Sequence, residues 1–171
     1  RGIGEQAREF VAPLDTQALY GERVAVYETN GEGWAWGQLE SDGYVGWLSE
    51  NALAKPGAEP TYHVIVPRTL CFPAPDIKRS PLTGLPMNAR LAVLRQDAKF
   101  VVTPNGWQLP ASHVAPLGTA YPDFVTVAEM FLGTPYLWGG KSVLGIDCSG
   151  LVQASMHATG RDCPRDSDMQ E

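Results

Sequence analysis

The chain has little positive charge and no cluster of it. Its 171 residues contain 13 Lys and Arg against 19 Asp and Glu, which gives a formal net charge of −6. Proteins that bind nucleic acid draw their affinity from clustered Lys and Arg side chains that contact the phosphate backbone. We therefore expect no nucleic-acid partner.

Long apolar runs are also missing. The apolar stretch at residues 114–117 is far shorter than the roughly 20 residues that a membrane-spanning helix requires. The sequence starts at Arg1 without a charged segment and an apolar core, the two parts of an export signal. We expect no membrane span in this chain, and we expect any export signal to have been removed or never to have existed.

Cysteine is scarce, with Cys71, Cys148 and Cys163 as the three thiols of the chain. Three cysteines are too few for a disulfide framework, and at least one must stay unpaired. A chemical role therefore explains the presence of at least one cysteine better than a disulfide does. A Cys148–Cys163 disulfide and a zinc site of Cys148, His157 and Cys163 are alternatives, although the zinc spacing matches no common ligand motif.

Short runs of β-branched and aromatic residues, separated by glycine-rich turns, fill residues 14–56. The predicted strands are residues 23–27, 34–36 and 44–48. This pattern is typical of a small antiparallel β unit. A segment at residues 1–13 precedes it.

The same order of signals recurs in residues 61–118. Residues 90–94 repeat the run at 23–27, and residues 109–115 repeat the run at 48–54. Repeats of this kind indicate two copies of one module. The Pro- and Gly-rich stretches before residue 61 and after residue 116 predict linkers.

Helical spacing replaces the β pattern in residues 122–171. We predict a helix from near Phe124, with a capping box formed by Thr126 and Glu129. A second helix is predicted to begin at Cys148 and to end at Gly160.

Three motifs stand in order in this last segment: GTPYLWGG at 133–140, DCSGLVQ at 147–153 and PRDS at 164–167. The ordered set resembles the NlpC/p60 peptidases, which hydrolyse bonds to D-glutamate in bacterial peptidoglycan stem peptides. The resemblance implies that residues 122–171 form the N-terminal, helical part of a papain-like peptidase domain. The two β modules resemble bacterial SH3-like barrels. We therefore expect an α+β fold, with two small SH3-like β-barrels followed by this helical part.

Cys148 is the predicted nucleophile. The attacking species is a thiolate, and the dipole and free N–H groups of a helix N-terminus favour that form. Backbone N–H groups at the same place can hold an oxyanion, and Gly150 is expected to leave room for close approach of substrate. The alternative for Cys148 is a small buried hydrophobic side chain.

The resemblance implies further site residues in the same segment. Tyr136 is expected to face the reacting carbonyl, with simple packing as its alternative. Asp147, Ser149, Trp138 and Ser167 are expected to contact substrate. Their alternatives are a helix N-cap for Asp147, first-turn polarity for Ser149, a core or pocket wall for Trp138 and a solvated loop for Ser167.

Glu22 and Tyr44 in the first β module match an acidic and an aromatic position that dipeptide-releasing relatives place near the free amine of the substrate. A carboxylate at Glu22 is able to pair with that ammonium group. The alternatives are a solvated edge glutamate and a packing tyrosine.

No histidine of the chain fits the role of general base. His157 follows Cys148 by nine residues, which on a helix is half a turn out of phase and about 13.5 Å along the axis. His63 and His113 lie in the second β module and are expected to be ordinary histidines. The resemblance implies a catalytic histidine on a strand beyond residue 171. We therefore expect the chain to be a fragment that lacks the C-terminal half of the peptidase domain and is inactive alone.

The predicted function is that of a cysteine peptidase that hydrolyses γ-D-glutamyl-L-diamino acid bonds in peptidoglycan peptides, from a murein tripeptide upward, without a metal or cofactor. One alternative is a cell-wall-binding SH3-like protein with a degenerate or incomplete peptidase domain. Another is an acyl transferase or amidase, because one fold supports several reactions. The sequence is compatible with a cytoplasmic role in muropeptide recycling and with a periplasmic or cell-wall role.

Overall fold

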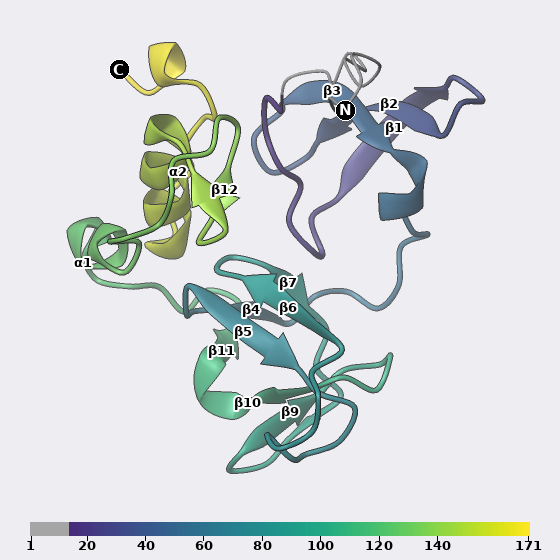
Figure 1. Ribbon diagram of the computed structural model, residues 1–171, viewed down its shortest axis with the longest axis vertical. Helices are drawn as coiled ribbons and strands as arrows, with labels where there is room; N and C mark the ends of the chain where they lie inside the picture. Colours follow the sequence, from purple (N-terminus) through teal and green to yellow (C-terminus); the bar gives the residue numbers. More distant parts are fainter. Residues whose placement is uncertain (1–13) are drawn as a thin grey trace, which may run out of the picture.

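The computed structural model describes residues 14–171, and the predicted segment 1–13 lies outside the described residues. Figure 1 shows three groups of elements, which follow one another from purple through teal to yellow along the chain. Small antiparallel sheets make up the first two groups, and both α-helices of the described part lie in the third. This architecture confirms the predicted α+β fold class.

The first group, which we call the first module, is a three-stranded antiparallel sheet in the order β1-β2-β3. Its strands are β1 (Val24–Thr29), β2 (Trp34–Leu39) and β3 (Val45–Ser49). They coincide with the three predicted runs. A register shift between Val26 and Glu28 marks a bulge in β1.

The second group, which we call the second module, contains eight short strands in three small antiparallel sheets, β11-β4-β7, β5-β6 and β10-β9-β8. The strands are β4 (Tyr62–Val64), β5 (Arg68–Cys71), β6 (Thr83–Pro86), β7 (Arg90–Leu91), β8 (Arg95–Gln96), β9 (Phe100–Val102), β10 (Gln108–Pro110) and β11 (Val114–Pro116). Their inner faces share one apolar core around Val64, Leu91 and Leu109.

Both modules contain a 3₁₀ turn after one of their later strands, and the predicted repeat stays a prediction. A 3₁₀ turn at Glu50–Ala52 follows β3, and a 3₁₀ turn at Ala111–His113 follows β10. The predicted strand at residues 90–94 is shorter than expected. The backbone N–H of Val93 donates to the hydroxyl of Thr61 at 3.0 Å. It therefore does not pair with the backbone of a neighbouring strand.

The third group holds α1 (Phe124–Glu129), the hairpin of β12 (Lys141–Ser142) and β13 (Gly145–Ile146), and α2 (Cys148–Ala158). The helices pack around Val127, Phe131 and Ala154, and Met87 of the second module joins this core. No helix within residues 14–171 is long and apolar enough to cross a membrane.

The predicted capping box of α1 is wrong. Asp123 is the N-cap, and its carboxylate accepts hydrogen bonds from the N–H groups of Val125 and Thr126. The Thr126 hydroxyl also donates to Asp123, at 2.9 Å. Aspartate is among the strongest N-cap residues, so the helix begins one turn earlier than the Thr126–Glu129 pattern indicates.

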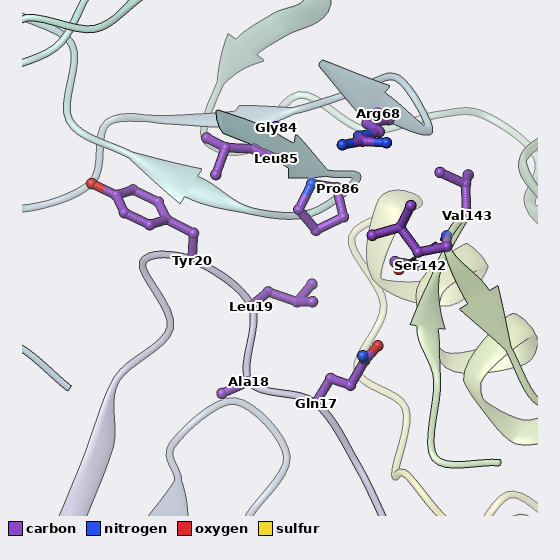
Figure 2. Close-up of a pocket in the computed structure, with 11 residues that line it drawn as sticks. Gln17, Ala18, Leu19, Tyr20, Arg68, Gly84, Leu85, Pro86, Ser142 and Val143 are labelled. Atoms are coloured by element: carbon purple, nitrogen blue, oxygen red, sulfur yellow. Dashed lines mark hydrogen bonds between the residues drawn. The ribbon is translucent and has the colours of Figure 1, made fainter. Parts of the chain in front are cut away.

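Residues 14–22, which we call the strap, run along all three groups before the first module begins. The Gln17 side chain accepts a hydrogen bond from the N–H of Lys141 at 2.8 Å. The Tyr20 carbonyl accepts one from the N–H of Arg90, also at 2.8 Å. Figure 2 shows Leu19 beside Pro86 of β6, with Gln17 near Ser142 of the β12–β13 hairpin, around a cavity of about 280 Å³.

The strap depends on Gly21, which provides the first prediction. Gly21 has φ +81°, and a Cβ there would overlap the carbonyl oxygen of Arg90; Gly31 has φ +74° and open space around it. We expect Gly31→Ala to cost about 1–2 kcal/mol from backbone strain alone. Gly21→Ala should cost a further ~1–3 kcal/mol, because the backbone of Arg90 must move. Urea denaturation measures both losses, and equal losses would contradict a close contact between the strap and β7.

Candidate active site

Cys148 is the first residue of α2, as predicted, and its side chain is exposed. It opens into a cleft of about 300 Å³. The cleft is mostly apolar, with Phe131, Ile146 and Leu151 among the residues that line it. An exposed thiol at a helix N-terminus beside an apolar cleft is suited to nucleophilic attack on a bound substrate.

Asp147 is the N-cap of α2 and lies beneath the helix end, with 7% of its surface exposed. One carboxylate oxygen accepts from the N–H of Gly150 at 2.7 Å. The other accepts from the N–H of Gly139 and from the guanidinium of Arg165, both at 2.7 Å. Burial acts to raise the pKa of Asp147, but Arg165 and the two N–H groups outweigh it and leave that pKa lowered. A fixed negative charge therefore lies under the start of α2.

Arg165 is the partner that the sequence analysis missed. Its side chain is 1% exposed. It donates to the Ser149 hydroxyl at 2.7 Å and to Thr16 of the strap at 3.2 Å, besides its bond to Asp147. A guanidinium can donate five hydrogen bonds in a fixed plane, so it ties three separate segments together. The signal was present, since a buried N-cap carboxylate needs a cation and the PRDS motif supplies one.

Ser149 and Gly150 serve the helix start in ways that differ from the predictions. Ser149 is buried and is held by Arg165 and by Gln170, whose amide donates to the Ser149 carbonyl at 3.1 Å. A Cβ on Gly150 would overlap the carbonyl oxygen of Gly140. The room at Gly150 is therefore filled by the protein's own backbone and is not left open for substrate. The predicted substrate contacts of Asp147 and Ser149 stay predictions.

The two aromatic residues of the GTPYLWGG motif are both exposed. Tyr136 lines the same cleft as Cys148, and an isolated parallel bridge joins it to Ile146. The residues that line the cleft do not include Trp138. Tyr136 shares the cleft with Cys148 and Trp138 does not, and both predicted roles stay predictions.

Tyr44 of the first module lies near the PRDS motif. Burial and the carboxylates of Asp166 and Asp15 raise the pKa of Tyr44, while the charge of Arg165 opposes them. Asp166, like Arg165, was assigned no role from the sequence. Ser167, its neighbour, is exposed at the start of a 3₁₀ turn. Tyr44 and Ser167, predicted from distant motifs, therefore lie in the same part of the molecule.

The Glu22 carboxylate already has two partners. It accepts from the N–H of Leu19 at 2.6 Å and from the hydroxyl of Ser41 at 2.8 Å. These contacts hold the end of the strap against the turn between β2 and β3. The predicted contact with a substrate amine stays a prediction.

None of the three histidines, all within the described residues, lines the cleft. His113 shares a hydrogen bond with Thr69 at 2.9 Å. Burial lowers the pKa of His63 and of His157. The general base is therefore absent from the described side of the cleft.

The two alternative uses of the cysteines are not formed. All three thiols are unpaired, and Cys163 is buried while Cys148 is exposed. Within residues 14–171 no group of three or more His, Cys, Asp or Glu side chains is placed to hold a metal ion. The described residues therefore contain no Cys148–Cys163 disulfide and no such group around Cys148, His157 and Cys163.

Comparisons with known proteins match two parts of the chain to family models. Residues 7–53 match the family model of the bacterial dipeptidyl-peptidase Sh3 domain, and residues 133–171 match that of the NlpC/P60 family. A gamma-D-glutamyl-L-lysine dipeptidyl-peptidase of Bacillus cereus is 32% identical over 92% of this chain and 54% of its own length. The protein of the same name from Bacillus subtilis is 32% identical over 90% of this chain and 56% of its own length.

A solved structure agrees with these relatives. The crystal structure of an NlpC/P60 family protein from Bacillus cereus has a TM-score of 0.77 and 29% identity, over 91% of this chain and 58% of that one. The chain thus spans about half the length of the curated relatives it matches.

The exposure of Cys148 predicts selective alkylation. With iodoacetamide at pH 8, Cys148 in the folded protein should react at least about tenfold faster than the other two thiols, because the thiolate must be both formed and accessible. Burial raises the pKa of Cys71 to about 11 and also raises that of Cys163. Peptide mapping by mass spectrometry gives the three rates, with urea-unfolded protein as the control in which the rates converge. Equal rates in the folded protein would contradict the geometry.

The pairing of Asp147 with Arg165 predicts a large loss of stability in Arg165→Gln. Removing one partner of a buried pair costs about 3–5 kcal/mol. Because the pKa of Asp147 is lowered on folding, its ionised form stabilises the protein above the unfolded pKa of about 3.9. That contribution disappears as the pH falls through the lower, folded pKa, so wild type and variant should converge in acid.

Denaturant unfolding between pH 3 and pH 7 measures this difference. Arg161→Gln is the matched control, since Arg161 is exposed on the same segment and should change stability by less than about 0.5 kcal/mol. The double variant Arg165→Gln with Asp147→Asn should recover part of the loss, because it removes the unpaired charge. An equal loss in Arg161→Gln and Arg165→Gln would exclude the buried pair as the cause.

Proposed function

Since residues 133–171 belong to the NlpC/P60 family and residues 7–53 to the bacterial dipeptidyl-peptidase Sh3 family, we propose that the chain forms the cysteine-bearing half of a peptidoglycan peptidase. The family is one of cysteine peptidases, which are hydrolases. The proposed reaction is hydrolysis of γ-D-glutamyl-L-diamino acid bonds in stem peptides. The observation that carries this proposal is the exposed Cys148 thiol at the start of α2, beside the apolar cleft.

The names of the two Bacillus relatives describe release of a dipeptide at a bond between D-glutamate and L-lysine. Lysine is an L-diamino acid, so this bond belongs to the proposed class. An enzyme that releases a dipeptide must bind the amino terminus of its substrate two residues away from the bond that it cleaves. A recognition site for a free amine near the nucleophile is therefore part of the proposal.

In the proposed mechanism, the Cys148 sulfur attacks the γ-carbonyl carbon of D-glutamate and forms a tetrahedral oxyanion. The free N–H groups at the start of α2 stabilise this negative charge. We assign to Tyr136, which lines the same cleft, the role of directing its hydroxyl toward the same oxygen. Collapse of the intermediate expels the amine of the diamino acid and leaves a thioester on Cys148. Water then hydrolyses the thioester and restores the thiol.

A general base must take the thiol proton and return it to the departing amine. The cleft is not lined by His63, His113 or His157. We therefore assign this role to a histidine outside residues 1–171. Asp147 and Ser149 support the nucleophile through the helix start, and Trp138 is proposed as a wall for the bound peptide.

Recognition of the free amine is assigned to the surface between the first module and the PRDS motif. Glu22 and Tyr44 are the proposed contacts, and Ser167 lines the same region. The carboxylates of Asp166 and Asp15 lie near Tyr44. They add negative charge that attracts an ammonium group. Charge-assisted hydrogen bonds of this kind are about twice as strong as neutral ones.

The test is Cys148→Ser in the intact protein, with L-Ala-γ-D-Glu-L-Lys and its diaminopimelate counterpart as substrates. Loss of the nucleophile should lower the rate of dipeptide release at least about a thousandfold. Liquid chromatography with mass spectrometry measures the product, and Cys163→Ala is the control that should keep activity. Wild-type binding to peptidoglycan without hydrolysis would favour the cell-wall-binding alternative. Transfer of the dipeptide to an acceptor other than water would favour an acyl transferase.

A further inference from the structure

Asp42 lies in the turn between β2 and β3, where its side chain is buried against the third group of elements. Its side chain is 0% exposed, and that of Lys141, which faces it from β12, is 2% exposed. Charged side chains are almost never this deeply buried unless they are paired. The pair joins the first module to β12, the first strand of the hairpin that precedes the cysteine helix.

The two oxygens of Asp42 face different parts of the molecule. One accepts a hydrogen bond from the backbone N–H of Tyr44 at 3.1 Å. The other accepts from the side-chain amide of Gln153 at 3.0 Å and lies 3.7 Å from the ammonium nitrogen of Lys141. A single carboxylate therefore connects the backbone of Tyr44 to both α2 and β12.

Gln153 extends this connection to the PRDS side. Its amide also donates to the carbonyl of Cys163 at 3.1 Å, one residue before the motif begins. Both amide protons of Gln153 are thus used, one toward the first module and one toward the segment that carries Asp166. Gln153 therefore bonds both to the turn that carries Tyr44 and to the segment before the PRDS motif.

His157, one turn further along α2, packs into the same cluster. Burial and the nearby charge of Lys141 lower the pKa of His157, while the Cys163 backbone, Glu22 and Asp42 oppose them. Among the groups around His157, Asp42 is the carboxylate in ion-pair contact with Lys141.

The energetics favour a positioning role over a stabilising one. The cost of removing two charges from water often exceeds the attraction between them, so a buried pair is weak support for stability. Within residues 14–171, the Lys141 ammonium and the Gln153 carbonyl oxygen also lack hydrogen-bond partners. A buried polar cluster that is costly in this way is best understood as a device that specifies one arrangement.

We propose that Asp42 is a positioning residue that fixes Tyr44 relative to Cys148 and thereby sets the preference for substrates with a free N-terminal amine. This inference rests on the proposed function, which assigns amine recognition to the region of Tyr44. Asp42 does not touch the substrate. It acts through the backbone of Tyr44 on one side and through Lys141 and Gln153 on the other.

The kinetic test compares Asp42→Asn, Lys141→Met and their combination in the intact protein. Asp42→Asn keeps an oxygen for the Tyr44 N–H but leaves the Lys141 ammonium buried without a counter-ion. The KM for L-Ala-γ-D-Glu-L-Lys should rise about tenfold to a hundredfold with kcat nearly unchanged, because small displacements of a binding group cost this much. The KM for the N-acetylated tripeptide, which has no amine to place, should change less than about twofold.

The double variant and a matched control exclude a general loss of structure. Asp42→Asn with Lys141→Met removes both charges, so no ionised group is left buried without a counter-ion. The double variant should therefore recover most of the amine preference. Asp76→Asn is the control, since Asp76 accepts a backbone hydrogen bond from Lys78 in the same way but lies in the second module.

Hydrogen exchange at the Tyr44 amide gives a measurement that does not need catalysis. Exchange should be at least tenfold faster in Asp42→Asn and in Lys141→Met, near wild type in the double variant, and unchanged in Asp76→Asn. If wild type hydrolyses neither peptide, the proposed function fails while exchange still decides the positioning role. Unchanged exchange, or equal changes in KM for both peptides, would overturn the inference.

Discussion

The buried ion pair between Asp147 and Arg165 is the contact on which the rest of the candidate site depends. Both charges are buried, so each requires the other, and the carboxylate also needs the two backbone N–H groups that it binds. The start of α2, the PRDS motif and the strap must therefore be in place together. The hydrogen bonds of Asp147 and Arg165 hold the start of α2 in place. Cys148, at that start, is exposed to the cleft.

The same physical means recurs where the first module meets the cysteine helix. Asp42 and Lys141 form a second buried pair, which contacts the middle of α2 through Gln153. Arg23 and Glu59, by contrast, form an exposed pair, which contributes little to structure in water. The two buried pairs thus fix the arrangement of separate segments. The exposed pair of Arg23 and Glu59 does not.

Features with local signals could be predicted from the sequence, and features that depend on distant partners could not. The start of α2 at Cys148 follows from a short pattern and is confirmed. The predicted stop at Gly160 is nearly right, since α2 ends at Ala158 and Gly160 has a positive φ two residues later. The N-cap of α1 was misassigned because Asp123 stands just before the pattern that suggested a capping box. Arg165 and Asp42 were missed because burial is invisible in a local pattern. Their partners lie 18 and 111 residues away in sequence.

The strap has a consequence for how the protein is made. Thr16 bonds to Arg165 across 149 residues of sequence, and Gln17 bonds to Lys141 across 124. Contacts between residues so far apart slow folding, because a long loop must close before they form. During synthesis the first module emerges with its strap still lacking these partners, because Lys141 and Arg165 are synthesised more than 100 residues later. The nucleophile therefore cannot reach its final surroundings until translation has passed Arg165, which delays the appearance of a reactive thiol.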